Sequence, residues 1–442
     1  MHEIGLDALV AGIAAIPTVT RMGRVAELSG GTLHVTGLSD VAALGDRVTI
    51  AGRDGVALGG EVLRIARDCV TVLPDDSLEG LAIGARVELG GQTAIAPDWS
   101  WIGRIVDPFG QPLDGLPLFP GPAPRRLRAI APAAAQRRRL GGRLETGMAV
   151  FNTLLPLARG QRIGLFAGSG VGKSTLLAKF ARGVEADVVV IALVGERGRE
   201  LREFVEAVLG PEGMARAVVV TATSDQSPLL RRRCAWAAMA VAEHFRDQGA
   251  HVLFLADSIT RFAEAHREIA LSAGEGASLR GFPPSTSHLV MSLAERAGPG
   301  VEGAGDITAI FTVLVAGSDM EEPIADILRG VLDGHVVLDR QIAERGRFPA
   351  VDLLRSVSRS LPDVATEDEN RLIAEARRLL GAYDRAEVMI QAGLYAPGSD
   401  PVVDAAIRVW PALDAFLAKD AGQGARESFA QLAACLATGS DR

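Results

Sequence analysis

The segment AGSGVGKST, residues 167–175, has the residue types and spacing of a loop that holds the phosphates of a nucleotide. It follows the apolar run RIGLF and precedes the helical pattern STLLAKFARG, and a P-loop needs both neighbours. Backbone N–H groups of such a loop surround the phosphates, its lysine reaches the β and γ groups, and its serine hydroxyl ligates Mg²⁺. Alanine replaces glycine at the first motif position, which is acceptable because that residue only ends the strand. The predicted nucleotide-binding residues are Gly168, Ser169, Gly170, Val171, Gly172, Lys173, Ser174 and Thr175, with Ser174 also a metal ligand.

Phosphoryl transfer to water also needs a second acidic group for Mg²⁺ and a group that polarises the attacking water. The run HVLFLADS places Asp257 at the carboxyl end of a strand, where ligands of doubly wound sheets bind, so Asp257 suits the metal site. The run VVVIALVGERGRE brings Glu196 and Arg197 to the same edge, where Glu196 would orient water and Arg197 would meet the γ-phosphate. The alternatives are an ordinary helix N-cap for Asp257 and a solvated charged loop for the other two.

These groups need a parallel sheet behind them, and the middle of the chain predicts one. Between about residues 145 and 359, apolar runs of strand length alternate with helical patterns. Uninterrupted apolar strands joined by helical crossovers indicate a mainly parallel sheet covered on both faces, which is an α/β core. The runs are RIGLFAG, DVVVIALVG, AVVVTATS, HVLFLADS and ITAIFTVLVAG.

Regions of different texture flank this core. From residue 25 to about 91, glycine-rich sequence with short alternating runs (TLHVTG, DRVTIAG, CVTVLP, RVELGG) predicts a small β-barrel or sandwich. A proline-rich stretch at residues 107–132 predicts a connector with little regular structure. After residue 363, helical spacing without strong strands predicts a helical bundle.

Composition narrows the classes of function. With 48% hydrophobic and 23% charged residues, the 442-residue chain has a soluble globular profile, and its length favours about three domains. The 46 basic and 54 acidic residues give a net charge of −8, which argues against a general grip on nucleic acid. Three widely spaced cysteines form neither a disulfide framework nor a metal site, which fits a reducing cytosol. The uncharged run at residues 8–20 is too short to span a bilayer, and a plain amphipathic helix and a partner-docking helix both remain open there.

Five motifs, in one order along the chain, carry a family resemblance. The sequence resembles the ATPase of the flagellar protein-export apparatus, a family that belongs with the α and β subunits of rotary ATP synthases. The motifs are GLFAGSGVGKST, ALVGERGRE, LFLADSITRFAEAHREIA, GHVVLDRQIAERGRFPAVDLLRSVSR and GLYAPGSDPVVDAAI.

The resemblance implies an ATPase that uses ATP and Mg²⁺ and has three parts. The three parts are a small β-barrel at residues 21–92, a RecA-like P-loop domain at 93–362 and a C-terminal helical domain at 363–442, and they follow a helical segment predicted at residues 1–20. The division read from the chain itself is the same.

The resemblance also assigns roles to single residues. It implies that Glu196 activates the attacking water, that Arg359 of the SVSR motif enters the site of a neighbouring subunit, and that Phe348 stacks on adenine. The alternatives are a surface charge at the end of a strand or turn for Arg359 and a core aromatic for Phe348. Arg261 matches a position near the γ-phosphate, and the loop at residues 280–288 matches a segment facing the bore of a ring, although a plain turn is also open.

The implied function is a cytoplasmic homohexameric motor, peripheral at the inner-membrane export apparatus, that couples ATP hydrolysis to docking, release and translocation of export substrates. The implied partners are export-gate membrane proteins, a stator-like regulator, a coiled-coil stalk protein, and export substrates with their chaperones, with no nucleic acid. The alternatives are the ATPase of a virulence-type (injectisome) secretion system, a rotary ATP synthase subunit and an RNA-translocating hexamer. Residues 25–92 contain no Phe, Tyr or Trp, which disfavours the last because base stacking needs exposed aromatics.

Overall fold

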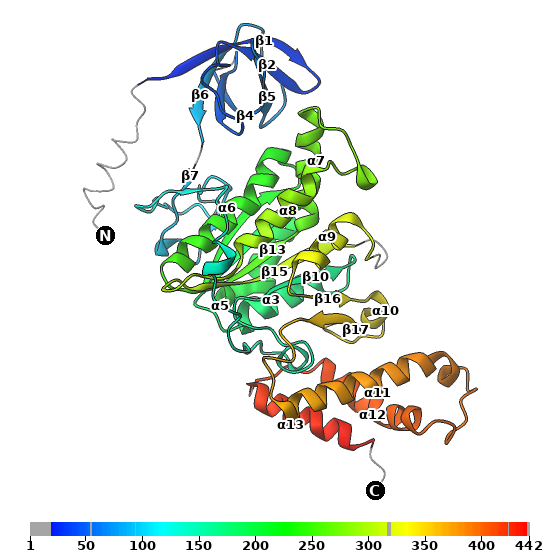
Figure 1. The fold of residues 1–442 in the computed structure, drawn as a ribbon. Helices are drawn as coiled ribbons and strands as arrows, with labels where there is room; N and C mark the ends of the chain where they lie inside the picture. Colours follow the sequence, from blue (N-terminus) through cyan, green and yellow to red (C-terminus); the bar gives the residue numbers. More distant parts are fainter. Residues whose placement is uncertain (1–18, 54, 93, 316–319, 423, 440–442) are drawn as a thin grey trace.

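The computed structural model describes residues 19–53, 55–92, 94–315, 320–422 and 424–439. Figure 1 shows three parts in a row: a small barrel, a sheet covered by helices, and a group of helices that ends the chain. This order confirms the predicted fold class. The helical segment predicted at residues 1–20 lies almost wholly outside the described residues, and the boundaries at residues 20, 92 and 362 stay predictions.

The N-terminal part is a closed six-stranded barrel in the order β1-β2-β5-β4-β3-β6. Its interior is a cluster of small branched side chains such as Val35, Ile50 and Val72, all fully buried. On its outer side Glu61 forms an ion pair of 2.7 Å with Arg232 of the central part, and both side chains are buried. The strands are β1 (Arg21–Ser29), β2 (Thr32–Thr36), β3 (Arg47–Ala51), β4 (Ala57–Ile65), β5 (Val70–Pro74) and β6 (Arg86–Gly91).

Residues 94–136, which include the connector predicted at residues 107–132, contain only short elements, as the prolines predict. The one that matters for the sheet is β8 (Ile105–Val106), which pairs in parallel with β12 at the edge of the central sheet. The others are β7 (Ala94–Ile95), η1 (Trp99–Trp101), β9 (Arg125–Arg126) and η2 (Ala134–Gln136).

The central sheet has the order β17-β16-β10-β15-β13-β11-β12-β8, with β14 pairing β15 beside this path. The five predicted strands are present and parallel, and only β14 and β17 run antiparallel to their neighbours. Their carboxyl ends therefore meet at one edge. The strands are β10 (Arg162–Ala167), β11 (Val188–Glu196), β12 (Ala217–Thr223), β13 (His251–Asp257), β14 (Gly298–Pro299), β15 (Asp306–Leu314), β16 (Gly334–Leu338) and β17 (Val351–Ser358).

Helices cover both faces of this sheet, so alternate residues of β11 enter two different cores. Val189 and Ile191 pack with α3, whereas Val188 and Val190 pack with α6, α7 and α8. Burial on both faces explains why these strands are uninterrupted apolar runs. The helices are α2 (Ala149–Asn152), α3 (Lys173–Gly183), α4 (Gly198–Glu203), the π-helix η3 (Phe204–Leu209), α5 (Gly210–Met214), α6 (Pro228–Asp247), α7 (Ile259–Ser272), η4 (Leu279–Gly281), α8 (Ser285–Arg296), α9 (Pro323–Val331) and α10 (Arg340–Glu344).

The C-terminal part consists of α11 (Glu367–Gln391), α12 (Pro401–Leu417) and α13 (Gly424–Ala437). A capping box starts α11: the Thr366 hydroxyl accepts from the Glu369 N–H, and the Glu369 carboxylate accepts from the Thr366 N–H. Apolar side chains of all three helices join the core that contains α3. Among the described residues, no helix combines the length and apolarity needed to cross a bilayer.

Candidate nucleotide-binding and catalytic site

The P-loop connects the carboxyl end of β10 to the first turn of α3. Ala167 is the last residue of β10 and is fully buried, so the alanine at the first motif position lies in the strand, as expected. Gly170 and Gly172 have φ angles of 77° and 84°, a left-handed conformation that favours glycine. Gly172 is also the N-cap of α3, and α3 begins at Lys173. The N–H groups of the first helical turn therefore face the loop, as phosphate binding requires.

Three charged residues that are far apart in sequence meet at this edge of the sheet. The Lys173 ammonium forms an ion pair with the Asp257 carboxylate, and its Nζ lies 3.8 Å from Glu196 Oε1. Asp257 Oδ1 also accepts a hydrogen bond of 2.7 Å from the Thr312 hydroxyl. They meet because β11 and β13 are adjacent parallel strands, with Leu193 opposite Asp257. The predicted grouping of Lys173, Glu196 and Asp257 at one edge is thus what the structure contains.

The environment of Glu196 suits a proton acceptor. Burial, and next the negative charge of Asp257, raise the pKa of Glu196 to about 7, and the Lys173 charge opposes the shift. A carboxyl group whose pKa lies near neutral pH can accept a proton from water more readily than an ordinary glutamate.

The N-cap alternative for Asp257 is wrong. The residue that caps α7 is Ser258, whose hydroxyl accepts a hydrogen bond of 3.3 Å from the Arg261 N–H. Asp257 instead ends β13, and its side chain is only 4% exposed.

Two hollows that share Ser174 and Glu196 in their linings lie beside these residues. A cleft of about 890 Å³ is lined by the P-loop together with Glu196, Arg197 and Arg261. A smaller cavity of about 250 Å³ is lined by Ser174, Glu196 and Asp257. Ser174 and Asp257 thus offer a hydroxyl and a carboxylate to one cavity, and Mg²⁺ binds such oxygen donors while keeping waters and substrate phosphates as its other ligands. The residues present fit a Mg²⁺ ion.

The two arginines of the cleft are less constrained. The Arg197 side chain is 80% exposed, and its Nη1 lies 3.3 Å from Glu200 Oε1. Arg261 is 45% exposed and pairs with Glu264 at 3.0 Å. Both line the cleft, so a bound phosphate could draw either away from these solvated partners.

Phe348 lies against the P-loop. Its ring atom Cδ1 stands 3.1 Å from the point where a β-carbon on Gly172 would be. The residue is 49% exposed, so the core-aromatic alternative is wrong. About half of the residue is exposed to solvent beside the loop, where an aromatic ring could stack on a flat ligand.

Arg359 lies at the opposite end of the sheet. Because β17 runs antiparallel to β16, Val351 pairs with Leu338 beside the P-loop end, whereas Ser358 pairs with Gly334. The length of β16, roughly 13 Å at 3.3 Å per residue, therefore separates Arg359 from the level of the P-loop. Its Nη2 donates to the Arg329 carbonyl at 3.2 Å, and the side chain lines a separate open hollow of about 1,050 Å³.

The segment at residues 280–288 is only partly a loop. Ser285 to His288 form the first turn of α8, which follows Pro283 and Pro284 because proline is compatible with a helix start. The Arg267 guanidinium lies 5.0 Å from the centre of the Phe282 ring.

Two residues beside the charged groups of the site were not predicted from the sequence. Thr312, on β15, contacts Asp257, and Arg231, on α6, lines the cleft while pairing with Glu268 at 3.0 Å. Neither carries a local signal: Thr312 lies within the apolar run ITAIFTVLV, and Arg231 is the first of three consecutive arginines. Only the order of the strands could have placed them.

Known proteins share this architecture. Residues 147–358 match the nucleotide-binding domain of the ATP synthase alpha/beta family, and residues 365–436 match the T3SS EscN ATPase C-terminal domain. The flagellum-specific ATP synthase of Caulobacter vibrioides is 46% identical over 422 residues, which cover 94% of this chain and 95% of that protein. The type 3 secretion system ATPase of Xanthomonas euvesicatoria is 42% identical over 413 residues, which cover 93% and 92%.

A solved structure agrees over nearly the whole chain. The assembled ATPase EscN from the type III secretion system of enteropathogenic E. coli superposes with a TM-score of 0.85 at 36% identity, covering 94% of this chain and 100% of that one. The predicted family and the predicted ATP hydrolysis are confirmed, and the chain belongs with the flagellum-specific ATP synthases and type 3 secretion system ATPases of the ATP synthase alpha/beta family.

Proposed function

We propose that this chain is the ATP-hydrolysing motor of a flagellar type III protein-export apparatus and works as a homohexameric ring. The observation that carries the proposal is the placement of Lys173, Glu196 and Asp257 at one end of the central sheet and of Arg359 at the other. Each chain then carries part of one site at each end of its sheet. In a closed ring of copies, the P-loop end of one subunit meets the Arg359 end of the next.

In each site the P-loop N–H groups and Lys173 hold the β- and γ-phosphates, and Phe348 stacks on adenine. Ser174 and Asp257 hold Mg²⁺, which when bound offsets the charge of those phosphates. Glu196 orients the attacking water and accepts its proton, which its raised pKa favours. Arg197, at the mouth of the cleft, meets the γ-phosphate.

Arg359 completes the site of the adjacent subunit. A fixed guanidinium stabilises the charge that develops on the transferred phosphoryl group. Its distance from the P-loop of its own chain supports this assignment, since β16 and β17 direct it to the other end of the sheet. Hydrolysis therefore depends on assembly.

The relatives support the flagellar assignment and a stalk partner. Flagellum-specific ATP synthases of Caulobacter vibrioides and Salmonella typhimurium are 46% and 44% identical to the chain. EscN has been solved with its central stalk EscO, which supports a stalk partner here as well. The remaining proposed partners are export-gate membrane proteins, a stator-like regulator, and export substrates with their chaperones, and the proposed location is the cytoplasmic side of the inner membrane at the export apparatus.

An injectisome ATPase is the second candidate, because the Xanthomonas euvesicatoria relative is 42% identical. Deleting the gene separates the two. Loss of flagellar filament protein from the culture medium, restored by the wild-type gene but not by Lys173→Ala, is the expected result. Intact filaments together with loss of another secreted set of proteins would assign the chain to an injectisome.

A further inference from the structure

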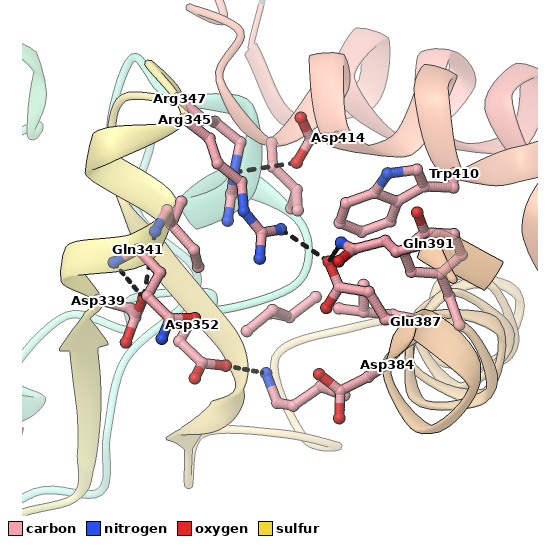
Figure 2. A pocket seen from close by; sticks show the side chains of 16 residues that line it. Asp339, Gln341, Arg345, Arg347, Asp352, Asp384, Glu387, Gln391, Trp410 and Asp414 are labelled. Atoms are coloured by element: carbon pink, nitrogen blue, oxygen red, sulfur yellow. Dashed lines mark hydrogen bonds and ion pairs between the residues drawn. The ribbon is translucent and has the colours of Figure 1, made fainter. Parts of the chain in front are cut away.

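A short segment joins the nucleotide site to the C-terminal helices. Residues 345–350, here called the strap, connect α10 to β17 and contact both the P-loop and the helices α11 and α12. Figure 2 shows the strap arginines pointing toward those helices across a cavity of about 370 Å³. The strap therefore contacts two parts of the molecule at once.

Arg347 fixes the strap to α12. Its Nε lies 3.1 Å from Asp414 Oδ1, and its Nη2 donates to the Val351 carbonyl at 2.9 Å. The side chain is only 8% exposed, so this guanidinium depends on the Asp414 carboxylate as a counter-charge. An ion pair of this kind holds a geometry because losing one partner leaves a buried charge unpaired.

Arg345 fixes the strap to α11. Its Nη1 lies 3.1 Å from Glu387 Oε1, although this pair is more exposed to solvent. Tyr383 of α11 and Trp410 of α12 stack with ring centres 4.3 Å apart and planes 9° from parallel. The helices that receive the strap are thus themselves joined by a rigid aromatic contact.

The next residue along the strap faces the other way. Phe348 follows Arg347 directly, and its ring lies against Gly172 of the P-loop. Because Arg347 contacts α12 and the adjacent residue Phe348 contacts the P-loop, a shift of Arg347 toward or away from α12 moves the Phe348 ring relative to the phosphate loop. We propose that Asp414, through its ion pair with Arg347, is a positioning residue that sets the Phe348 ring for the nucleotide base and so couples the C-terminal helices to ATP affinity.

This inference rests on the proposed stacking of Phe348 on adenine. It predicts a change in KM rather than in kcat, and a change limited to ligands that carry a base. Misplacing one stacking ring should weaken ATP binding about three- to tenfold. Tripolyphosphate, which binds the P-loop without a base, should be unaffected.

Asp414→Asn in the full chain is the test, and Asp384→Asn is the matched control. Asp384 is an exposed carboxylate on the wall of the same cavity, and it has no ion pair among the described residues. Asp414→Asn should raise KM for ATP three- to tenfold, keep kcat within about twofold, and leave the inhibition constant of tripolyphosphate unchanged. Asp384→Asn should change none of these. Equal weakening of ATP and tripolyphosphate by Asp414→Asn would overturn the inference.

Two further variants protect the test against unfolding and against failure of the proposed function. Arg347→Met combined with Asp414→Asn leaves no buried charge unpaired, and it should keep the wild-type melting temperature while showing the raised KM; a wild-type KM would overturn the inference. In a Phe348→Ala background, Asp414→Asn should have no further effect on KM, and an undiminished effect would likewise overturn it. A Phe348→Ala variant with a wild-type KM would instead refute the proposed role of Phe348 itself.

Discussion

The two ends of the central sheet differ in how far one chain completes them. At the carboxyl ends of the strands, Lys173, Glu196 and Asp257 are already in contact and largely buried, and the cleft has its own phosphate loop. At the opposite end, Arg359 lines an open hollow and has only a carbonyl as hydrogen-bond partner among the interactions described. The first end holds the groups that would bind a nucleotide, whereas the second presents a guanidinium to a hollow whose lining contains no phosphate loop. The difference supports the proposal that the functional unit is an interface between copies.

Removing the Arg359 guanidinium should have the largest effect on activity. Arg359→Ala should lower kcat about 10³-fold or more, because an arginine supplied to a phosphoryl group contributes on that scale. Nucleotide affinity of single subunits should stay within about twofold, since Arg359 lies far from the P-loop of its own chain. Steady-state hydrolysis and titration with a fluorescent nucleotide measure the two quantities. Loss of affinity comparable to the loss of kcat would place Arg359 in its own chain's site.

The carboxyl end is tested by separating binding from chemistry. Glu196→Gln should lower kcat by about 10²- to 10⁴-fold with nucleotide affinity kept, because only the proton acceptor is lost. Lys173→Ala should abolish nucleotide binding, since in the proposed site the ammonium contacts the phosphates directly. Equal losses of affinity in both variants would refute this division of roles.

His251, at the start of β13, should make the stability of the protein depend on pH. His251 begins the strand and is 4% exposed; burial, and next the Arg159 charge, lower its pKa from 6.5 to about 4. Because the folded pKa lies below the unfolded value, the free energy of unfolding is unaffected above pH 6.5 and falls as the pH drops from 6.5 to 4. At pH 4, protonation of His251 in the unfolded state should lower the free energy of unfolding by about 3 kcal/mol.

His251→Gln should therefore flatten the dependence of unfolding free energy on pH between 6.5 and 4. Urea unfolding at a series of pH values measures it. His266, whose pKa is also lowered to about 4 by burial, serves as the comparison position. Parallel wild-type and His251→Gln curves would show that His251 does not titrate differently in the two states.

The smallest expected effect concerns Arg197. Its side chain is 80% exposed, so Arg197→Ala should change the free energy of unfolding by less than about 0.5 kcal/mol. If it meets the γ-phosphate, kcat should fall about tenfold or more, since charge-assisted contacts to a phosphoryl group are worth that much. An unchanged kcat would leave Arg197 a solvated surface residue.

The P-loop end of the sheet could be predicted from the sequence because the residues that identify it lie close together in the chain. A strand, a glycine loop and a helix lie within about twenty residues, and uninterrupted apolar runs identify the five parallel strands. Ion pairing of Lys173 with Asp257, 84 residues away, additionally required that parallel strands end at one edge.

The opposite end of the sheet, where Arg359 lies, could not be predicted in the same way. Only half of the residues of β17, VDLLRSVS, are buried, and no feature of this segment predicts that it runs antiparallel to β16. That return is what moves Arg359 away from the P-loop of its own chain. The ion pair between Arg347 and Asp414 likewise joins residues of two different parts of the molecule, and their spacing along the chain does not predict it.

Mixing two inactive variants tests the shared site most directly. A subunit with Lys173→Ala still carries Arg359, and a subunit with Arg359→Ala still carries an intact P-loop, so hybrid interfaces can be complete. In rings mixed at random, the hydrolysis rate should rise from near zero to a maximum at equal amounts, where about one quarter of the interfaces hold both intact groups. No recovery at any ratio, or full activity of a strictly monomeric preparation, would contradict the account.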